Sequence, residues 1–403
     1  MEPAGQAHLL APPGPGPFPE AELLAGPSGE RFGIYVHCPY CRTKCPYCDF
    51  NVAIHREDRI APFVAGLRAE LGRYAGLPWA GRVPAESLFL GGGTPSLLPP
   101  EAVAAVLADA RQGLGLGPDA EVTLEANPEG LDVDRLRAFR AAGVTRLSLG
   151  VQALDDALLR RLGRTHSAAD AEAAYRAARA AGFEDVSVDL LYGCPGQDLA
   201  AWVGTLDQAL AWGPDHLSAY ALTLEPATPF GRRPPPGLPE EDLQVAFFEV
   251  LVERATRAGL ARYEISNFAR PGRRSRHNLG YWRREEYIGL GPGAHGALGA
   301  VRYWTQRSEP RWRAGALAGR WVINGWERLS ERQVAAERIV LGLRLAEGIP
   351  VQWLERHLAG VPDGPGAVLA RYEAAGIATV RDGRLALTDR GVLVSDAIFA
   401  ELV

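Results

Sequence analysis

The sequence of 403 residues predicts an α/β fold: a curved, partly open barrel of six strand–helix units, followed by a smaller C-terminal α+β region. From Phe32 onward, short β-like runs alternate with helix-length amphipathic runs. Right-handed connections of this kind build a parallel sheet, and six units are too few for the usual closed barrel of eight. From about Ser330 the pattern changes to helices, which marks the second region.

The predicted strands are apolar runs of β-branched and aromatic residues, at 32–38, 87–93, 121–128, 145–152, 185–193 and 216–226. The predicted helices show apolar residues at three- and four-residue spacing, at 58–74, 100–112, 132–142, 168–181, 199–212 and 240–259.

The chain divides into four predicted parts. Residues 1–30 are rich in Pro, Gly and Ala and predict a flexible leader, 31–265 the barrel, and 266–329 a connecting segment. Residues 330–403, with helices, a hairpin around Asp382 and Gly383 and a last helix, resemble a winged helix. Such folds often bind DNA, but the acidic balance and the absence of a basic recognition helix favour a packing or partner module.

Composition limits the possible functions. The net charge of -5 gives no electrostatic support for nucleic-acid binding. No uninterrupted apolar stretch is long enough for a membrane span, and the N-terminus lacks the pattern of a secretion signal, so a cytoplasmic protein is expected. Five cysteines, an odd number and mostly clustered, indicate reduced thiolates that bind metal rather than a disulfide framework.

The segment HCPYCRTKCPYCDF contains four cysteines, Cys38, Cys41, Cys45 and Cys48. Two CxxC pairs suggest zinc, but structural zinc sites normally place the pairs a dozen or more residues apart. Four ligands in so tight a loop are typical of an electron-carrying iron–sulfur protein. Alternation from Ile34 to Cys38 instead places Cys38 at the end of a buried strand, where free cysteine often serves as a small apolar residue. The remaining CxxxCxxC then leaves one iron of a four-iron cluster without a protein ligand.

The segment YVHCPYCRTKCPYCDFN resembles the signature of radical S-adenosylmethionine (SAM) enzymes. The resemblance implies a [4Fe-4S] cluster on Cys41, Cys45 and Cys48, with the open iron chelated by SAM. It extends from about Phe32 to the C-terminus, and it implies a partial (β/α)6 TIM-like barrel of the radical SAM type.

Polar residues at the ends of the predicted strands agree with this resemblance, because ligand sites of such barrels form at the carboxyl ends of strands. Backbone N–H and C=O groups of the GGGTP run are expected to approach SAM. The resemblance implies SAM contacts at Tyr35, Tyr47, Gly92, Gly93, Thr94, Glu125, Gln152, Arg164, Asp189 and Thr223. His37 is expected to support the cluster loop without ligating iron.

Within this superfamily the chain resembles two groups, the oxygen-independent coproporphyrinogen III dehydrogenases and the HemW heme chaperones. The dehydrogenases carry a further cysteine two residues after the third ligand, where this chain has Phe50, as the chaperones do. The segment HNLGYW matches the HNxxYW motif proposed for heme binding, which implies heme contacts at His277, Tyr281 and Trp282. In the alternative interpretation His277 orders a loop and both aromatic residues are core. His295 is interpreted as a loop-ordering residue.

The resemblance therefore implies a chaperone that binds heme, a [4Fe-4S] cluster and SAM, and passes heme to acceptor hemoproteins. It also implies an electron donor for the cluster and acceptors that include membrane-associated respiratory proteins. Arginines before HNLGYW can pair with heme propionates: Arg270, Arg273, Arg274 and Arg276. The alternatives are a coproporphyrinogen dehydrogenase, and a four-cysteine iron–sulfur carrier or zinc protein. Cys38 and Cys194 depart from the aliphatic residues usual in the family.

Overall fold

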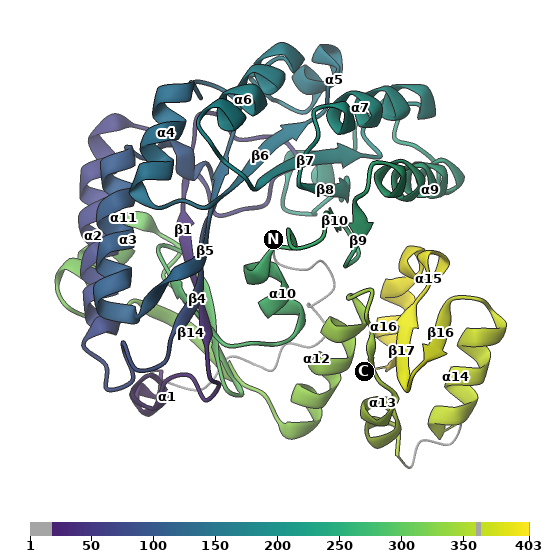
Figure 1. Cartoon of the computed structure of the whole chain (residues 1–403). Coiled ribbons are helices and arrows are strands. Elements are labelled where there is room, and N and C mark those ends of the chain that lie inside the picture. Colours follow the sequence, from purple (N-terminus) through teal and green to yellow (C-terminus); the bar gives the residue numbers. More distant parts are fainter. Residues whose placement is uncertain (1–17, 360–363, 403) are drawn as a thin grey trace.

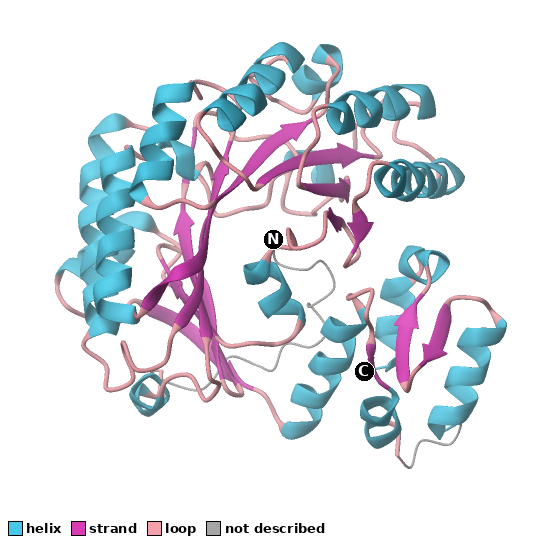
Figure 2. Cartoon of the chain, in the orientation of Figure 1, coloured by secondary structure: helices cyan, strands magenta, loops and turns pink. Residues whose placement is uncertain are grey.

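The computed structural model describes residues 18–359 and 364–402 of the chain. Six parallel strands form the predicted open barrel, in the spatial order in which they follow along the chain. Each overlaps its predicted range: β1 (Phe32–Cys38), β4 (Ala85–Gly92), β5 (Leu116–Ala126), β6 (Arg146–Gln152), β7 (Val186–Tyr192) and β8 (His216–Ala221). Figure 1 shows the curved sheet with its outer helices, and Figure 2 shows the same view by secondary structure.

The helices between these strands cover the convex face of the sheet (Figure 1). The six predicted helices are confirmed as α2 (Glu57–Ala75), α3 (Pro100–Leu114), α4 (Val133–Ala142), α6 (Ala168–Ala180), α7 (Leu199–Ala211) and α9 (Glu241–Arg257). Two shorter helices, α5 (Asp156–Arg161) and α8 (Pro229–Arg232), were not predicted. Within the described residues, no helix has the length and apolarity needed to cross a membrane.

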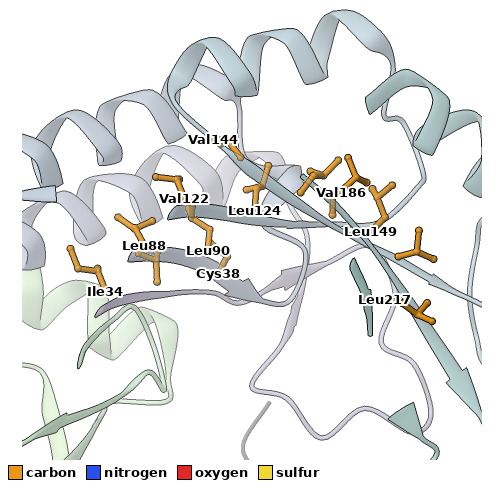
Figure 3. Packing of buried hydrophobic residues seen from close by; sticks show 14 of the residues in the cluster. Ile34, Cys38, Leu88, Leu90, Val122, Leu124, Val144, Leu149, Val186 and Leu217 are labelled. Atoms are coloured by element: carbon orange, nitrogen blue, oxygen red, sulfur yellow. The ribbon is translucent and has the colours of Figure 1, made fainter. Parts of the chain in front are cut away.

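Side chains alternate across the barrel sheet because successive residues of a strand point to opposite faces. The outward face is aliphatic and packs under the helices, as Figure 3 shows for Ile34, Cys38, Leu88, Leu90, Val122, Leu124, Val186 and Leu217. The inward face is largely polar and aromatic. Registered pairs place Tyr35 beside Phe89 and Glu125 beside Ser148 on this face.

The segment predicted to connect two domains is instead part of the barrel sheet, which is a correction. On one edge, β11 (Tyr287–Leu290) pairs in parallel with β1, and antiparallel strands follow it: β12 (His295–Leu298), β13 (Val301–Thr305) and β14 (Ile323–Arg328). On the other edge, β10 (Asn267–Ala269) and β9 (Ala261–Arg262) extend β8. Two helices lie in this part of the chain, α10 (Arg276–Trp282) and α11 (Glu309–Leu317).

The predicted flexible leader is too long at its C-terminal end. Residues 1–17 of that prediction lie outside the described residues, but α1 (Glu20–Ala25) is a helix and its Leu23 is fully buried. The indole Nε1 of Trp79 donates to the carbonyl of Leu23 at 2.6 Å. This short helix therefore packs against the barrel, a tertiary contact that the Pro- and Gly-rich composition does not reveal.

The C-terminal region begins with α12 (Glu331–Leu343) and contains a three-stranded antiparallel sheet in the order β15-β17-β16. The predicted hairpin is confirmed, since Asp382 and Gly383 link β16 to β17 with positive φ angles of 50° and 72°. The winged-helix resemblance stays a prediction. The elements are β15 (Ile349–Pro350), α13 (Val351–His357), α14 (Gly364–Ala374), β16 (Ala378–Arg381), β17 (Arg384–Leu387), α15 (Asp389–Leu393) and α16 (Ser395–Leu402).

Candidate cofactor site

The cysteine loop follows β1 at the carboxyl end of the barrel strands. Two short parallel strands, β2 (Tyr40–Cys41) and β3 (Ala53–Ile54), close the base of this loop. Its start is bonded to the end of β4. The backbone N–H of Gly93 donates to the carbonyl of Cys38, and the N–H of Thr94 donates to the carbonyl of Tyr40, both at 2.7 Å. The loop is thus held where ligand sites of such barrels form.

Cys38 faces away from this loop. It shares the outward face of β1 with Ile34 and Val36 and is 1% exposed in the aliphatic core (Figure 3). Burial raises the pKa of its thiol far above the usual range, so the thiolate needed for metal binding is disfavoured there. The structure thus places Cys38 in the small apolar slot that the sequence predicts.

The three remaining thiols interact electrostatically with one another, and the protein supplies hydrogen-bond donors to two of them. The hydroxyl of Thr94 donates to Sγ of Cys41 at 3.6 Å, and Nη1 of Arg164 donates to Sγ of Cys45 at 3.8 Å. Burial, with smaller contributions from Cys45 and Cys41, raises the pKa of Cys48 to about 11. Neighbouring thiolates repel one another, so a cationic group bound between them would stabilise the thiolate state. The guanidinium of Arg164 adds positive charge beside Cys45.

The donor set of this loop consists of the thiols of Cys41, Cys45 and Cys48. A zinc ion draws all its ligands onto one centre, whereas each thiolate of a four-iron cluster binds its own iron. Three thiols on one short loop, with the fourth cysteine turned into the core, match a cluster with one open iron.

His37 braces the loop as predicted. Its Nδ1 lies 3.0 Å from the hydroxyl of Tyr35, and its Nε2 lies 2.9 Å from the carbonyl oxygen of Asn51. The Asn51 amide donates in turn to the carbonyl of Pro292 at 2.8 Å. Burial lowers the pKa of His37 to about 4, so the ring is neutral at physiological pH. Both ring nitrogens are engaged, which leaves none for iron.

The glycine run at the end of β4 is tied to Glu125. The N–H of Gly92 donates to Oε2 of Glu125 at 3.0 Å. A Cβ on Gly92 would lie 2.5 Å from the His37 ring, and its φ of 106° is one that L-residues avoid. The N–H groups of Gly92, Gly93 and Thr94 all donate within the protein. These N–H groups are therefore engaged within the protein and join β4 to the cluster loop. The contacts of Gly92, Gly93 and Thr94 with SAM, which include those of the carbonyl groups, stay a prediction.

Asp189 lies on the inward face of β7, held by hydroxyl groups. Ser148 donates to its Oδ2 at 2.7 Å and Ser187 donates to its Oδ1 at 2.8 Å. Burial raises the pKa of Asp189 although these hydroxyls oppose the shift, and burial also raises the pKa of Glu125, with a smaller contribution from Asp189. The two predicted carboxylates thus belong to one region of the barrel interior.

Asn127 is a residue that the site prediction missed. Its amide donates to the Thr94 hydroxyl at 3.0 Å, and its Oδ1 accepts from Nη2 of Arg164 at 2.5 Å. Asn127 therefore joins the residue that contacts Cys41 to the residue that contacts Cys45. Its place two residues after Glu125 in EANP, at the end of a predicted strand, was the signal that could have found it.

The other predicted SAM residues, Tyr47, Gln152 and Thr223, differ in how close they lie to the cysteine loop and in how buried they are. Tyr47 is partly buried beside Cys45 and Arg164, and burial raises its phenol pKa well above the usual range. Gln152 ends β6 with a φ of 66°, a left-handed conformation uncommon outside glycine. Thr223 lies exposed beyond the end of β8.

The loop that carries Arg164 is anchored by Glu129. Thr165 donates a hydrogen bond to Glu129, and Nδ1 of His166 lies 3.6 Å from its Oε1. Burial opposes ionisation of Glu129, but the nearby His166 ring and the hydrogen bond from Thr165 outweigh it and lower the pKa of Glu129 to about 2. The carboxylate therefore stabilises the folded state above its unfolded pKa, near 4.5, and this contribution is lost as the pH falls toward 2.

We expect the Glu129→Gln variant to be less stable than the parent at pH 7, with a difference that shrinks below about pH 4.5. Urea unfolding of both proteins at pH 7, 5 and 3.5 measures it. An exposed carboxylate, Glu101, provides the control as Glu101→Gln. A Glu129→Gln difference that stays constant between pH 7 and 3.5 would contradict the assignment.

The HNxxYW segment forms α10, which lies on the concave side of the sheet (Figure 1). His277 is 4% exposed, its Nδ1 lies 2.8 Å from Oγ of Ser87, and its Nε2 lies 2.8 Å from the hydroxyl of Tyr281. Both ring nitrogens are therefore hydrogen-bonded. In this conformation His277 has no free nitrogen to offer to a heme iron. It lies in α10 rather than in a loop, and its contact with heme stays a prediction.

The two aromatic residues of the motif are also packed within the protein. Tyr281 stacks edge-on against Tyr287, with ring centroids 4.7 Å apart. Trp282 lies under the guanidinium of Arg344, 4.9 Å from its ring centroid, and Arg344 also contacts Phe399 of the C-terminal region. The motif thus joins the barrel interior to the C-terminal region.

Comparison with known proteins gives matches along nearly the whole chain. Residues 35–209 match the radical SAM superfamily, and residues 329–394 match the HemN C-terminal domain. The heme chaperone HemW of Mycobacterium tuberculosis is 40% identical over 94% of this chain and 97% of that protein. HemW of Escherichia coli is 41% identical over 72% of this chain and 76% of its own. The solved coproporphyrinogen III oxidase HemN of Escherichia coli has a TM-score of 0.81 at 22% identity, covering 94% of this chain and 92% of that one.

Proposed function

The chain belongs to the HemW family of radical SAM proteins, and from this premise we propose that it binds heme and passes it to acceptor hemoproteins. The observation that carries the proposal is identity of 40% over nearly the full length of a heme chaperone. The likeness to the coproporphyrinogen oxidase, at 22% identity, is one of fold. The chain accordingly binds a [4Fe-4S] cluster, SAM and heme.

Cys41, Cys45 and Cys48 would hold the cluster in this proposal. When bound, the cluster and SAM would supply one-electron reductive chemistry at this end of the barrel. Arg164 and Thr94 fix two of the sulfurs by hydrogen bonds, and Asn127 ties these two residues together. Glu125, Gln152 and Asp189 line the side of the barrel on which SAM binds.

Heme binds near α10 in this proposal, where the preceding loop carries arginines for the propionates. Arg274 is exposed and stacks over Tyr263, with 5.7 Å to the ring centroid. Arg273 lies 4.0 Å from Glu184, so it is only weakly paired. Charge-assisted bonds from guanidinium groups to carboxylates are among the strongest polar contacts. His277 would serve as the iron ligand only after a ring nitrogen lost its hydrogen bond to Ser87 or Tyr281.

We expect the purified protein to bind heme and transfer it to an acceptor, but not to convert coproporphyrinogen. Titration with heme, followed by absorbance, measures binding, and mixing the loaded protein with an apo-hemoprotein measures transfer. The reconstituted protein is also incubated without oxygen with SAM and coproporphyrinogen III. Absence of heme binding, or formation of protoporphyrinogen IX, would contradict the chaperone function.

The remaining parts of the proposal concern the cell. Acceptors are hemoproteins, and we propose that they include membrane-associated respiratory proteins, with the chaperone itself in the cytoplasm and a separate electron donor reducing the cluster. The test is heme transfer to membrane vesicles that hold heme-free respiratory proteins. If heme were transferred to soluble acceptors but not to the vesicles, the proposal of membrane acceptors would be contradicted and the chaperone function would remain.

A further inference from the structure

We infer that His277 is a positioning residue for the SAM site. Its ring supports a layer of aromatic side chains, and this layer in turn supports the cluster loop and the predicted SAM contacts. The inference deepens the proposed function and rests on the SAM and cluster part of it. It concerns the HNxxYW motif in the state that the structure describes, in which this histidine lies inside the barrel.

Strand register places the inward side chains in layers across β1, β4 and β5. The lowest of these layers contains Gly33, Ser87 and Glu121, which face one another in register. The next layer contains Tyr35 and Phe89, and the layer above it contains His37 and Gly91. Glu125 lies two residues beyond the Phe89 partner Thr123 on β5, at the level of the predicted SAM contacts. His277 enters this stack from below.

The position of the His277 ring is fixed by several contacts. Ser87 and Tyr281 hold its two nitrogens at 2.8 Å each, and Oε1 of Glu121 accepts from its backbone N–H at 3.0 Å. A Cβ on Gly33 would lie 3.3 Å from the ring, so β1 leaves space for it by carrying glycine there. Burial lowers the pKa of His277 to about 3, which keeps the ring neutral and able to accept one bond and donate the other.

The ring supports the aromatic layer directly. Its centroid lies 5.3 Å from that of Phe89 and 6.5 Å from that of Tyr35, with interplanar angles of 28° and 30°. Tyr35 and Phe89 stack on each other at 6.3 Å. These three rings form one stacked group, so a change in the position of His277 is transmitted to both of its neighbours.

Two routes lead upward from this group to the cofactor site. The Tyr35 hydroxyl is bonded to His37, and His37 is bonded to the carbonyl of Asn51 in the cluster loop. Phe89 lies under Gly91, where a Cβ would be 2.8 Å from Cε1 of Phe89 and 3.1 Å from Oε2 of Glu125. Removing the His277 ring therefore loosens both the base of the cluster loop and the carboxylate expected to contact SAM.

The test uses the full chain with its reconstituted cluster. We expect His277→Ala to weaken SAM affinity about tenfold, the lower end of the range for residues that orient the ligands of a metal site. The change that SAM causes in the electron paramagnetic resonance spectrum of the reduced cluster should weaken as well. Iron content should stay at the parent value.

Two further variants keep the test decisive. Leu279→Ala is the matched control, since Leu279 is buried on the same helix but packs against Tyr263 and Leu345. It should leave SAM affinity unchanged. His277→Phe keeps the ring face while losing both nitrogen bonds, so it should recover most of the SAM response and serves where His277→Ala does not assemble its cluster.

The outcomes separate the inference from the proposed function. Parent-like SAM affinity and spectrum in His277→Ala would overturn the positioning role, as would an equal loss in Leu279→Ala. Loss of heme binding in His277→Ala with an intact SAM response would make His277 a heme ligand instead. Absence of heme binding in the parent protein would overturn the chaperone function and leave the SAM result standing.

Discussion

Replacement of Cys41, Cys45 or Cys48 by alanine is expected to abolish the [4Fe-4S] cluster, while Cys38→Ala and Cys194→Ala keep it. Each of the three ligands binds a different iron, so the loss of one opens a second iron to solvent and the cluster is lost. Alanine is chosen because serine can itself offer an oxygen ligand. Iron and sulfide content after anaerobic reconstitution, together with the visible absorbance of the cluster, measures the effect.

The two control cysteines differ from the three ligands in where they lie. Cys38 is 1% exposed on the helix-facing side of β1, and Cys194 is fully buried among aliphatic residues that include Leu159 and Leu191. Tyr47 of the cysteine loop covers the apolar cluster around Cys194, and the side chain of Cys38 lies in the aliphatic core, so both thiols are surrounded by apolar groups. A Cys38→Ala protein without cluster absorbance, or without a spectral change on adding SAM, would instead support the four-cysteine carrier or zinc alternative.

Glu121→Ala is expected to destabilise the folded protein by about 3 kcal/mol, since bonds from backbone groups to a buried carboxylate are individually worth about 1.5 to 3 kcal/mol. Its Oε2 accepts from the N–H of Arg276 at 2.7 Å, and its Oε1 accepts from the N–H of His277 at 3.0 Å and the hydroxyl of Ser275 at 3.3 Å. Glu121 thus holds the first turn of α10 inside the barrel. Its removal leaves these donors buried without their acceptor.

The shift of the urea midpoint, with the slope of the transition compared between proteins, measures this loss. Glu101→Ala is the matched control, a carboxylate in the first turn of α3 that is exposed to solvent. Its effect should stay within about 0.5 kcal/mol, as for surface charges near a helix N-terminus. Equal effects of the two substitutions would mean that Glu121 does not anchor α10.

Local pattern predicted most of the barrel. The six parallel strands and their six long helices follow from apolar runs that recur with two different periods. The connections between parallel strands are right-handed, which fixes the order of the strands in the sheet. The same reasoning missed β12, β13 and β14 because short antiparallel strands with Gly-rich links carry little periodicity. It missed α1 because the helix has only six residues, too few to show a helical period, and is held by the burial of Leu23 and the bond from Trp79 to its carbonyl.

The site was predicted unevenly for a related reason. Glu125 and Asp189 could be found because each is an acidic residue within an apolar strand, Glu125 near the carboxyl end of β5 and Asp189 in the middle of β7. Asn127 was not among the predicted site residues, since its importance lies in hydrogen bonds to Thr94 and Arg164, residues 33 and 37 positions away. The spacing of the motif identified His277, but not the partners that occupy its nitrogens.

The sequence by itself determined the six-unit barrel, the three-cysteine spacing and the place of Cys38 in an aliphatic slot, because these depend on periodicity and on neighbours along the chain. Only the tertiary structure decided that HNLGYW is a helix inside the barrel and that His277 is engaged there. The physical reason is that Ser87 is 190 residues from His277 and Glu121 is 156. Contacts over such distances exist only once the sheet has curved and brought them together.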